Sequence, residues 1–353
     1  MKMGLAILLS GLVCLCAPHA LARDYIHAVG SSTVYPFVTS VSEEFGRESR
    51  YKTPVVEATG TGGGFKIFCS GTGLKYPDIA DASRPIKDGE RELCLKNGVK
   101  NPIEIKIGYD GIVLAALRKT ETLSITRKEL FLALAKLIPV EGRLVPNHYR
   151  YWDEISPQLA HRPILIYGPP TSSGTRDAFS DLVLEEECKQ LPEFKAHYPD
   201  KEVLKKKCRQ MREDGVFVEA GENDNLIVQK LIHNPDALGI FGFSFLDQNQ
   251  DVLKATLIAG VDPDFDSIIS GKYSISRLLY VYIKAENVGF VPGIVEFVKE
   301  LLSDKALGQY GYTIDNGLIP LPREVLLRER TQIITILEAL QRDHQKNNTK
   351  TKK

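Results

Sequence analysis

The chain has 353 residues, of which 25% are charged, and its 45 Lys and Arg balance its 45 Asp and Glu, so the formal net charge is zero. This balance argues against general nucleic-acid binding, which requires a clearly basic domain. Binding of a small anion is not excluded, because backbone N–H dipoles hold an anion without a net positive charge.

The first 22 residues have the pattern of a cleavable export signal. Lys2 gives a positive start, the stretch from Leu5 to Cys16 is apolar, and Ala20-Leu21-Ala22 matches the small-residue cleavage pattern. The apolar stretch is too short for a membrane-spanning helix, which needs about 20 residues. Bulky residues directly before Cys14 and Cys16 disfavour lipid attachment. The remainder is long enough for about two domains and is expected to be soluble and exported.

Four cysteines follow the signal segment, an even number that favours two disulfides in an exported protein. Local pairing, Cys69–Cys94 and Cys188–Cys208, is the expectation. Four cysteines nevertheless permit three connectivities, and reduced, buried cysteines are the alternative. A metal site is not favoured, because the chain has no Cys-x-x-Cys pair and its seven histidines are scattered.

Short apolar runs alternate with helical periodicity along the first half of the chain, which is typical of an α/β protein. Strands are expected at 25–29, 54–58 and 78–82, and helices at 34–45 and from residue 63 to 69. The long apolar run 103–117 is interrupted by Gly108-Tyr109-Asp110-Gly111. It is expected to cross between two domains.

The second half continues the same pattern. We expect helices at 125–137, 178–188, 225–232, 292–302 and 323–342, and strands at 163–167, 237–242 and 276–283. The last of these strands is a candidate for a return crossing. The highly charged stretch 185–213 is expected to be an exposed helical insertion, and the basic, polar segment 342–353 to be a disordered tail.

Three turns rich in glycine and hydroxyl groups each follow an apolar run and precede an expected helix. They are Gly30-Ser31-Ser32-Thr33, the segment 59–64 (TGTGGG) and the segment 171–176 (TSSGTR). The start of a helix offers unpaired N–H groups and a partial positive charge. Glycine lets an anion approach the backbone, and Ser and Thr hydroxyls add donors. Together the turns predict a cage of proton donors for a small oxyanion.

Each turn also has a simpler interpretation. Ser31 or Ser32 would serve as an ordinary helix cap, and the second turn as a flexible linker. The second turn lacks the Lys-Ser/Thr of a nucleotide-binding P-loop, so binding by Thr61 and the Gly62 and Gly63 amides is preferred. In the third turn Arg176 adds a guanidinium that can grip an oxyanion with two donors, unless it pairs with the nearby Asp177 or Asp181.

Two further candidates lie outside the turns. Ser83 and Arg84 end the third expected strand, and strand ends are where α/β folds bind ligands. Asp110 lies in the expected crossing. A carboxylate in the cage would accept the proton of a hydrogenphosphate, which sulfate lacks, and so select the protonated anion. Asp110 is the candidate for this acceptor, with stabilisation of the turn before Gly111 as the alternative.

The turns contain no catalytic set. A nucleophilic Ser173 would need a base, and no histidine lies in any turn, although His148, His161 or His233 could converge there in the fold. A binding protein is therefore expected rather than an enzyme.

Taken together, the motifs resemble the phosphate-binding subunit of bacterial phosphate ABC importers, the PstS family. The resemblance rests on the segments 30–36, 59–66, 78–85, 173–179, 223–226 and 237–242, in this order. It implies a two-lobed periplasmic-binding-protein fold of type II, in which each lobe is a mixed, mostly parallel sheet flanked by helices and two hinge crossings join the lobes. Lobe I would comprise 23–108 and 274–341, and lobe II 109–273.

The resemblance further implies a monomeric periplasmic receptor that binds inorganic phosphate tightly, without a cofactor, and delivers it to the inner-membrane permease of an ABC importer. With the residues named above, the expected phosphate-binding set is Ser32, Thr33, Val34, Thr61, Gly62, Ser83, Arg84, Asp110, Ser173, Gly174, Thr175 and Arg176. The alternatives are a receptor for another oxyanion, sulfate or molybdate, and an exported phosphatase on the same scaffold.

Overall fold

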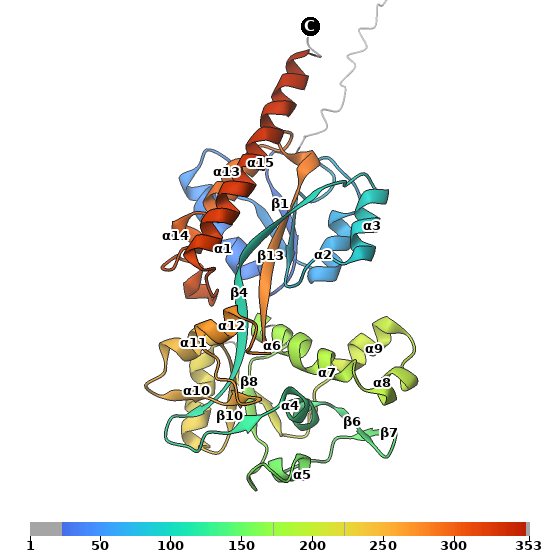
Figure 1. The fold of residues 1–353 in the computed structure, drawn as a ribbon, viewed down its shortest axis with the longest axis vertical. Helices are drawn as coiled ribbons and strands as arrows, with labels where there is room; N and C mark the ends of the chain where they lie inside the picture. Colours follow the sequence, from blue (N-terminus) through green and yellow to red (C-terminus); the bar gives the residue numbers. More distant parts are fainter. Residues whose placement is uncertain (1–22, 172, 222, 351–353) are drawn as a thin grey trace, which may run out of the picture.

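The computed structural model describes residues 23–171, 173–221 and 223–350, so the expected export signal lies outside the described residues. Two bodies, the upper and the lower in Figure 1, are joined by the long strands β4 (Pro102–Leu117) and β13 (Ser276–Lys284). Buried apolar residues of the upper body lie between residues 26 and 107 and between 279 and 337. Those of the lower body lie between 112 and 275, joined by Ile319.

The upper body is built on the sheet β2 (Val55–Ala58), β1 (His27–Gly30), β3 (Ile79–Ala82), β13 and β4, in that order. β1 is parallel to β2 and β3, whereas β13 is antiparallel to β3 and β4. Alternating residues of a strand face opposite sides, and Ile79 packs with α1 (Tyr35–Glu48) and α13 (Ile294–Leu301). Ala80 and Ala82 pack on the other side with α2 (Thr61–Phe68) and α3 (Asp88–Lys96).

In the lower body β4 pairs antiparallel with β10 (Leu238–Gly242) and β11 (Leu253–Ala255). β8 (Ile166–Gly168) is parallel to β10 and to β9 (Phe217–Glu219). A continuous helical segment follows β8, formed by α6 (Gly174–Phe179), the π-helical η1 (Ser180–Glu185) and α7 (Glu186–Cys188). It begins at Gly174, four residues before the expected start.

Shorter elements complete the fold. The helices are α4 (Arg127–Leu134), α5 (Trp152–Ile155), α8 (Pro192–His197), α9 (Lys201–Cys208), α10 (Asp224–His233), α11 (Phe243–Gln248), α12 (Phe265–Ile269) and α14 (Asp304–Leu307). Two single turns of 3-10 helix are η2 (Ala285–Asn287) and η3 (Ile314–Asn316). The strands are β5 (Ser124–Ile125), β6 (Leu137–Val140), β7 (Arg143–Pro146) and β12 (Leu257–Ile258). The helix expected at 125–137 is shorter in the structure, where α4 ends at Leu134 and the hairpin of β6 and β7 begins at Leu137.

Both expected disulfides are confirmed, Cys69–Cys94 in the upper body and Cys188–Cys208 in the lower. The second lies within the charged stretch 185–213. This stretch is helical as expected, but it is not exposed throughout, because Phe194 is buried and packs edge-on against Phe131 of α4. Phe194 and Met211 anchor the segment in the core of the lower body, and the disulfide joins its two ends.

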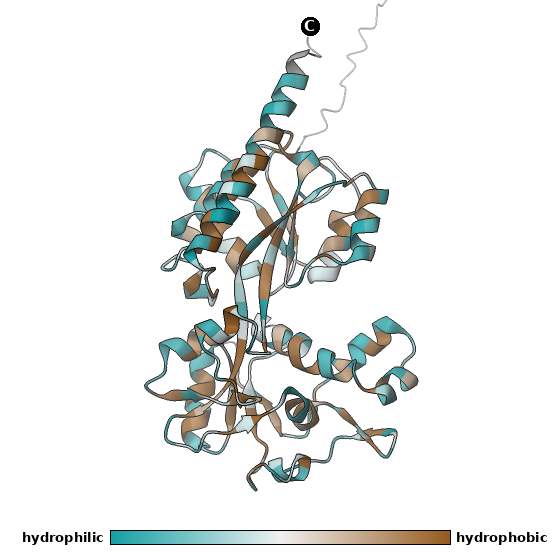
Figure 2. Ribbon diagram, in the orientation of Figure 1, coloured by the Kyte–Doolittle hydropathy of each residue, from teal (hydrophilic) through white to brown (hydrophobic). Residues whose placement is uncertain are grey.

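The helix α15 (Arg323–Lys350) is the longest of the described chain. Leu326, Ile333 and Leu337 are buried against the upper body, and the later turns extend beyond it as a largely hydrophilic rod (Figures 1 and 2). The expectation of disorder from 342 onward therefore differs from the structure, in which the helix continues to residue 350. Charge pairs one helical turn apart, including Arg342 with Glu338, support this continuation.

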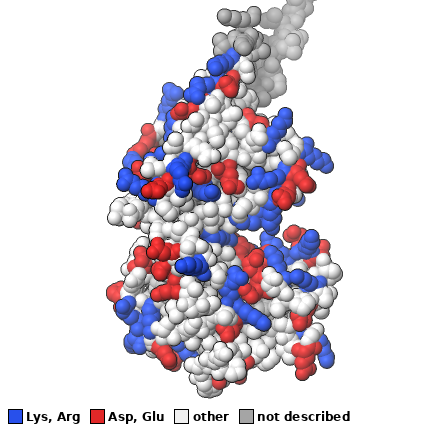
Figure 3. All heavy atoms as spheres, in the orientation of Figure 1, with Lys and Arg blue, Asp and Glu red and all other residues white. Residues whose placement is uncertain are grey.

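Lys and Arg side chains alternate with Asp and Glu over both bodies (Figure 3), in keeping with the zero net charge. Within the described ranges, no helix combines the length and apolarity needed to cross a membrane.

Candidate anion-binding site

The first turn lies between β1 and α1, at the carboxyl end of β1. Gly30 is required there, because a Cβ would lie 2.1 Å from the carbonyl oxygen of Asp81 on β3. Gly64 of α2 packs on the other side, where a Cβ would lie 2.5 Å from the Gly30 Cα. These two glycines allow the first turn, the start of α2 and the end of β3 to approach one another closely.

The second turn meets the end of β3 through a pair of hydroxyl groups. The Oγ1 of Thr61, the first residue of α2, lies 3.1 Å from the Ser83 Oγ and accepts a hydrogen bond of 3.2 Å from the Ser83 N–H. Two expected site residues, 22 positions apart, are thus in direct contact.

The third turn touches the first across the junction of the two bodies. A Cβ on Gly174, the first residue of α6, would lie 3.5 Å from both the Ser32 carbonyl oxygen and the Thr33 Cα. The Ser32 hydroxyl also donates to Asp177 of α6 over 3.1 Å. Residues about 140 positions apart in the sequence therefore form one site at the starts of α1 and α6.

The remaining residues of these turns lie at the same helix starts. Ser173 directly precedes α6, and Thr175 follows Gly174. The Val34 side chain is buried in the upper core, so only its backbone can face a ligand, and its N–H lies 3.4 Å from the Ser31 Oγ.

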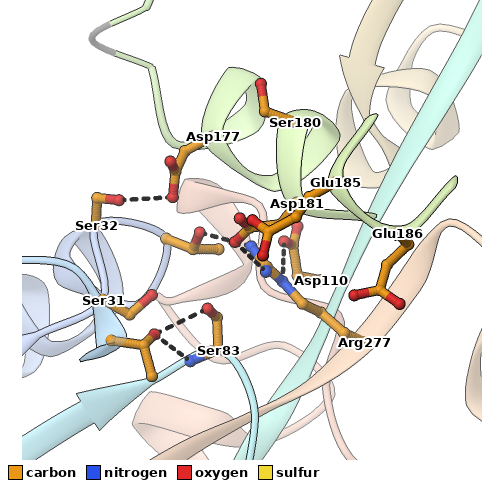
Figure 4. A network of polar contacts seen from close by, with 12 residues as sticks. Ser31, Ser32, Ser83, Asp110, Asp177, Ser180, Asp181, Glu185, Glu186 and Arg277 are labelled. Atoms are coloured by element: carbon orange, nitrogen blue, oxygen red, sulfur yellow. Dashed lines mark hydrogen bonds and ion pairs between the residues drawn. The ribbon is translucent and has the colours of Figure 1, made fainter. Parts of the chain in front are cut away.

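The sequence analysis missed Arg277, which lies at the centre of the polar network in Figure 4. Its guanidinium donates to the Thr33 hydroxyl over 2.9 Å, to Asp181 over 3.1 Å and to Asp110 over 3.4 Å. Arg277 on β13 is directly opposite Asp110 on β4. One signal was available, because Arg277 is the only charged residue in the apolar run 276–283.

Asp110 lies in β4 beside this guanidinium, and its side chain is mostly buried. Burial raises the pKa of Asp110, Arg277 opposes that shift, and the negative charge of Asp177 adds to it. The carboxyl is thus a buried group with an elevated proton affinity next to the first turn.

The two arginines expected in the site have other partners. Arg84 forms two hydrogen bonds with Glu90, of 2.8 and 2.7 Å, and lies over the Phe65 ring. Arg176 is buried over the Phe217 ring, with its guanidinium carbon 4.2 Å from the ring centroid. Burial lowers the pKa of Arg176 to about 10.

Arg176 does not pair with the nearby carboxylates, the alternative considered above. Asp177 and Asp181 are instead paired with Arg209, and Asp181 also with Arg277. The Nη1 of Arg176 has no hydrogen-bond partner within the part of the chain that the structure describes.

Across residues 23–171, 173–221 and 223–350, no group of three or more His, Cys, Asp or Glu side chains could hold a metal ion. His161 contacts Asp153 of α5 and stacks on Tyr151, and His148 packs against its neighbour Tyr149.

Comparison with known proteins places this arrangement in a family. A family model described as a PBP superfamily domain matches residues 17–305. Among curated proteins, the chain is 30% identical over 306 residues to Protein SphX of Synechococcus elongatus, with 85% of this chain and 78% of that protein covered. It is 28% identical over 313 residues to the phosphate-binding protein PstS of Staphylococcus saprophyticus, covering 87% and 84% of the two chains.

Solved structures agree with these relatives. A possible phosphate binding protein from Planctomyces limnophilus superposes with a TM-score of 0.69 at 28% identity, covering 89% of this chain and 98% of that chain. An ABC-type phosphate transport receptor from Vibrio cholerae gives a TM-score of 0.58 at 18% identity, covering 84% and 100%, and supports the mixed α/β fold. The resemblance inferred from the motifs is confirmed, and the chain belongs to the PBP superfamily, among relatives named PstS and SphX.

Proposed function

We propose that this protein binds inorganic phosphate and delivers it to the membrane permease of an ABC importer. The observation that carries the proposal is the close approach of the start of α6 to the turn before α1, where the Ser32 hydroxyl donates to Asp177 over 3.1 Å and a Cβ on Gly174 would lie 3.5 Å from the Ser32–Thr33 backbone. In this proposal the two helix N-termini, one from each body, supply backbone N–H groups and hydroxyl groups to the same anion. The relatives named as phosphate-binding proteins support the choice of ligand.

In this proposal the upper body supplies backbone and hydroxyl donors, and the lower body supplies a second set. The upper set comprises Ser32, Thr33, the Val34 amide, Thr61, Gly62 and Ser83, and the lower set comprises Ser173, Gly174 and Thr175. Hydrogen bonds to an anion are charge-assisted and therefore stronger than those between neutral groups. No sulfur, histidine or metal ligand is needed, which fits binding without turnover.

The principal positive charge is assigned to Arg277. Its guanidinium already donates to the Thr33 hydroxyl, whereas Arg84 and Arg176 would have to leave Glu90 and the Phe217 ring to reach a ligand. Arg84 and Arg176 are accordingly secondary candidates. An arginine on a crossing strand reaches both bodies at once.

The two bodies correspond in this proposal to lobe I (23–108 and 274–341) and lobe II (109–273) of a type II periplasmic-binding fold. The two lobes would move relative to each other by bending of β4 near Tyr109–Asp110 and of β13, as in hinge closure of other receptors. Tyr109 also pairs with Ile319, its N–H donating to the Ile319 carbonyl over 2.8 Å, so a third segment steadies the hinge. Closure excludes water and strengthens each hydrogen bond to the anion.

Asp110 is proposed as the acceptor for the proton of the bound phosphate. It lies opposite Arg277, and burial raises its pKa, so it has the proton affinity that such an acceptor requires. Sulfate has no proton to donate at neutral pH, and it would leave this carboxylate facing a second anion.

Delivery to a permease implies that the protein acts on the outer side of the cytoplasmic membrane, and the periplasm is the proposed location. It would act there as a monomer with phosphate as its ligand and with no cofactor. A strain lacking the gene should lose high-affinity phosphate uptake, and uptake should return when the gene is restored.

Titration calorimetry with phosphate and sulfate between pH 5 and 8 tests the proposal. We expect saturable phosphate binding at every pH and at least a hundredfold weaker binding of sulfate. No heat with phosphate, combined with clear binding of sulfate or molybdate, would reject phosphate as the ligand while leaving the fold unaffected.

A further inference from the structure

Three carboxylates line the side of the α6–η1 segment next to the candidate anion site. They are Asp177, Asp181 and Glu185, spaced four residues apart. Asp177 accepts the hydrogen bond from the Ser32 hydroxyl, and Asp181 accepts one from Arg277 (Figure 4). Negative charge at this place opposes binding of an anion.

The guanidinium of Arg209 contacts all three carboxylates. It forms ion pairs with Asp177 and Asp181 and lies 3.3 Å from Glu185. Its side chain is 23% exposed, so solvent screens these pairs only in part. Arg209 and Arg277 together hold Asp181 from opposite sides.

The position of Arg209 depends on the Cys188–Cys208 disulfide. Arg209 directly follows Cys208 at the end of α9, and Cys188 ends the helical segment that bears the three carboxylates. The disulfide therefore holds the backbone of Arg209 close to the helical segment whose carboxylates Arg209 neutralises. This gives the segment 185–213 a role that its charged composition did not reveal.

The charge of these carboxylates reaches the site itself. Asp177 contributes to the raised pKa of Asp110, which lies across the network next to Arg277. Without Arg209, the uncompensated Asp181 would attract Arg277 more strongly and compete with the Thr33 hydroxyl for its donors. With fewer Arg277 donors available to a ligand, the affinity for an anion falls.

We propose that Arg209 is a positioning residue of the anion site, and that the Cys188–Cys208 disulfide holds it against the three carboxylates, so that anion affinity depends on this disulfide. The inference rests on the proposed function in one respect only, namely that the site binds an oxyanion.

The test is titration calorimetry of the purified protein with inorganic phosphate at low ionic strength. Arg209→Gln, which replaces the charged guanidinium with a neutral amide, should bind phosphate on the order of tenfold more weakly. Arg209→Lys should recover most of the affinity. The deficit of Arg209→Gln should shrink at high salt, as screening weakens the charge of the carboxylates, which a purely structural defect would not do.

The two disulfides provide a matched pair of variants, because they close loops of similar length, with sequence separations of 20 and 25. Cys188→Ser/Cys208→Ser should weaken phosphate binding, and adding Arg209→Gln to it should cause little further loss. Cys69→Ser/Cys94→Ser should lower the unfolding midpoint and leave affinity within about twofold of wild type.

The outcomes distinguish a failure of the inference from a failure of the proposed function. If the wild type binds phosphate and Arg209→Gln binds it equally well, the inference alone is rejected. Equal losses of affinity in the two disulfide variants reject it as well, because they indicate general destabilisation. A wild type that binds neither phosphate nor sulfate refutes the proposed function and the inference together.

Discussion

At the scale of single residues, the Thr33 hydroxyl accepts a hydrogen bond from Arg277 and can donate its own proton to an anion. Replacing Thr33 with Val keeps the shape of the side chain and removes this donor. We expect a loss of about 1.5–3 kcal/mol of phosphate binding energy, the range for hydrogen bonds to charged groups. Calorimetric dissociation constants of the variant and the wild type measure the loss.

Thr39 offers the matched control for that substitution. It lies on α1, the helix that follows the turn with Thr33, and its Oγ1 is buried without a hydrogen-bond partner in the described chain. Thr39→Val should therefore leave phosphate affinity unchanged. Equal effects of the two substitutions would show that the Thr33 hydroxyl does not contact the ligand.

Asp81 is a second residue whose behaviour follows from its surroundings. It lies in β3 between Gly30 and Val281, is 1% exposed, and neither carboxyl oxygen has a partner in the described ranges. Burial raises its pKa to about 8. The folded protein therefore holds a proton here that the unfolded chain releases above pH 4, and ionisation of Asp81 opposes folding.

This linkage predicts that Asp81→Asn, which cannot ionise, stabilises the protein by an amount that depends on pH. Relative to wild type, the free energy of unfolding of the variant should rise by up to about 1.4 kcal/mol per pH unit between pH 4 and 8, then level off. Urea unfolding at pH 4.5 and 7.5 measures the difference. A constant difference at the two pH values would show that Asp81 ionises normally in the folded protein.

Asp78, three residues earlier, is the control, because it is equally buried but partnered by Arg23 and Asn287. Asp78→Asn removes the charge that Arg23 requires. It should lower stability at both pH values, the opposite of the effect expected for Asp81→Asn at pH 7.5.

At the scale of elements, α15 combines a packed first half with a projecting second half. Leu337 is fully buried in the upper core, whereas its neighbour Ile336 is 38% exposed. Leu337→Ala should destabilise the protein by about 2–5 kcal/mol, and Ile336→Ala by less than about 1.5 kcal/mol. Chemical denaturation of both variants tests this, and similar losses would mean that α15 does not pack as described.

At the scale of the whole molecule, the candidate site joins two bodies, each with its own apolar core. A ligand that bonds to both bodies stabilises the folded protein by mass action. Phosphate at a hundred times its dissociation constant should add about 2.7 kcal/mol to the free energy of unfolding. Thermal melts with phosphate and with equimolar sulfate measure this, and equal stabilisation by both anions would contradict selection of the protonated ligand.

Much of the local structure of this protein is determined by residues that are neighbours in the sequence. Hydroxyl-rich turns such as 30–33 and 59–64 follow an apolar run and precede a segment with helical periodicity. They indicate helix starts that can bind an anion. The even cysteine count and the short separations predicted both disulfides correctly. The strand around Gly108–Gly111 is also predicted to link two bodies, because a long extended segment with a glycine pair inside it suits a crossing, and β4 forms this link.

Only the tertiary structure decided which charges meet in the site. Arg84 and Arg176 were adjacent to anion-binding motifs, yet the fold turns them toward Glu90 and Phe217. Arg277 instead reaches Thr33, 244 residues away, because antiparallel pairing of β13 with β4 sets its position. A helix start or a turn is specified by a few consecutive residues. An ion pair depends on the relative placement of distant segments, which packing alone fixes.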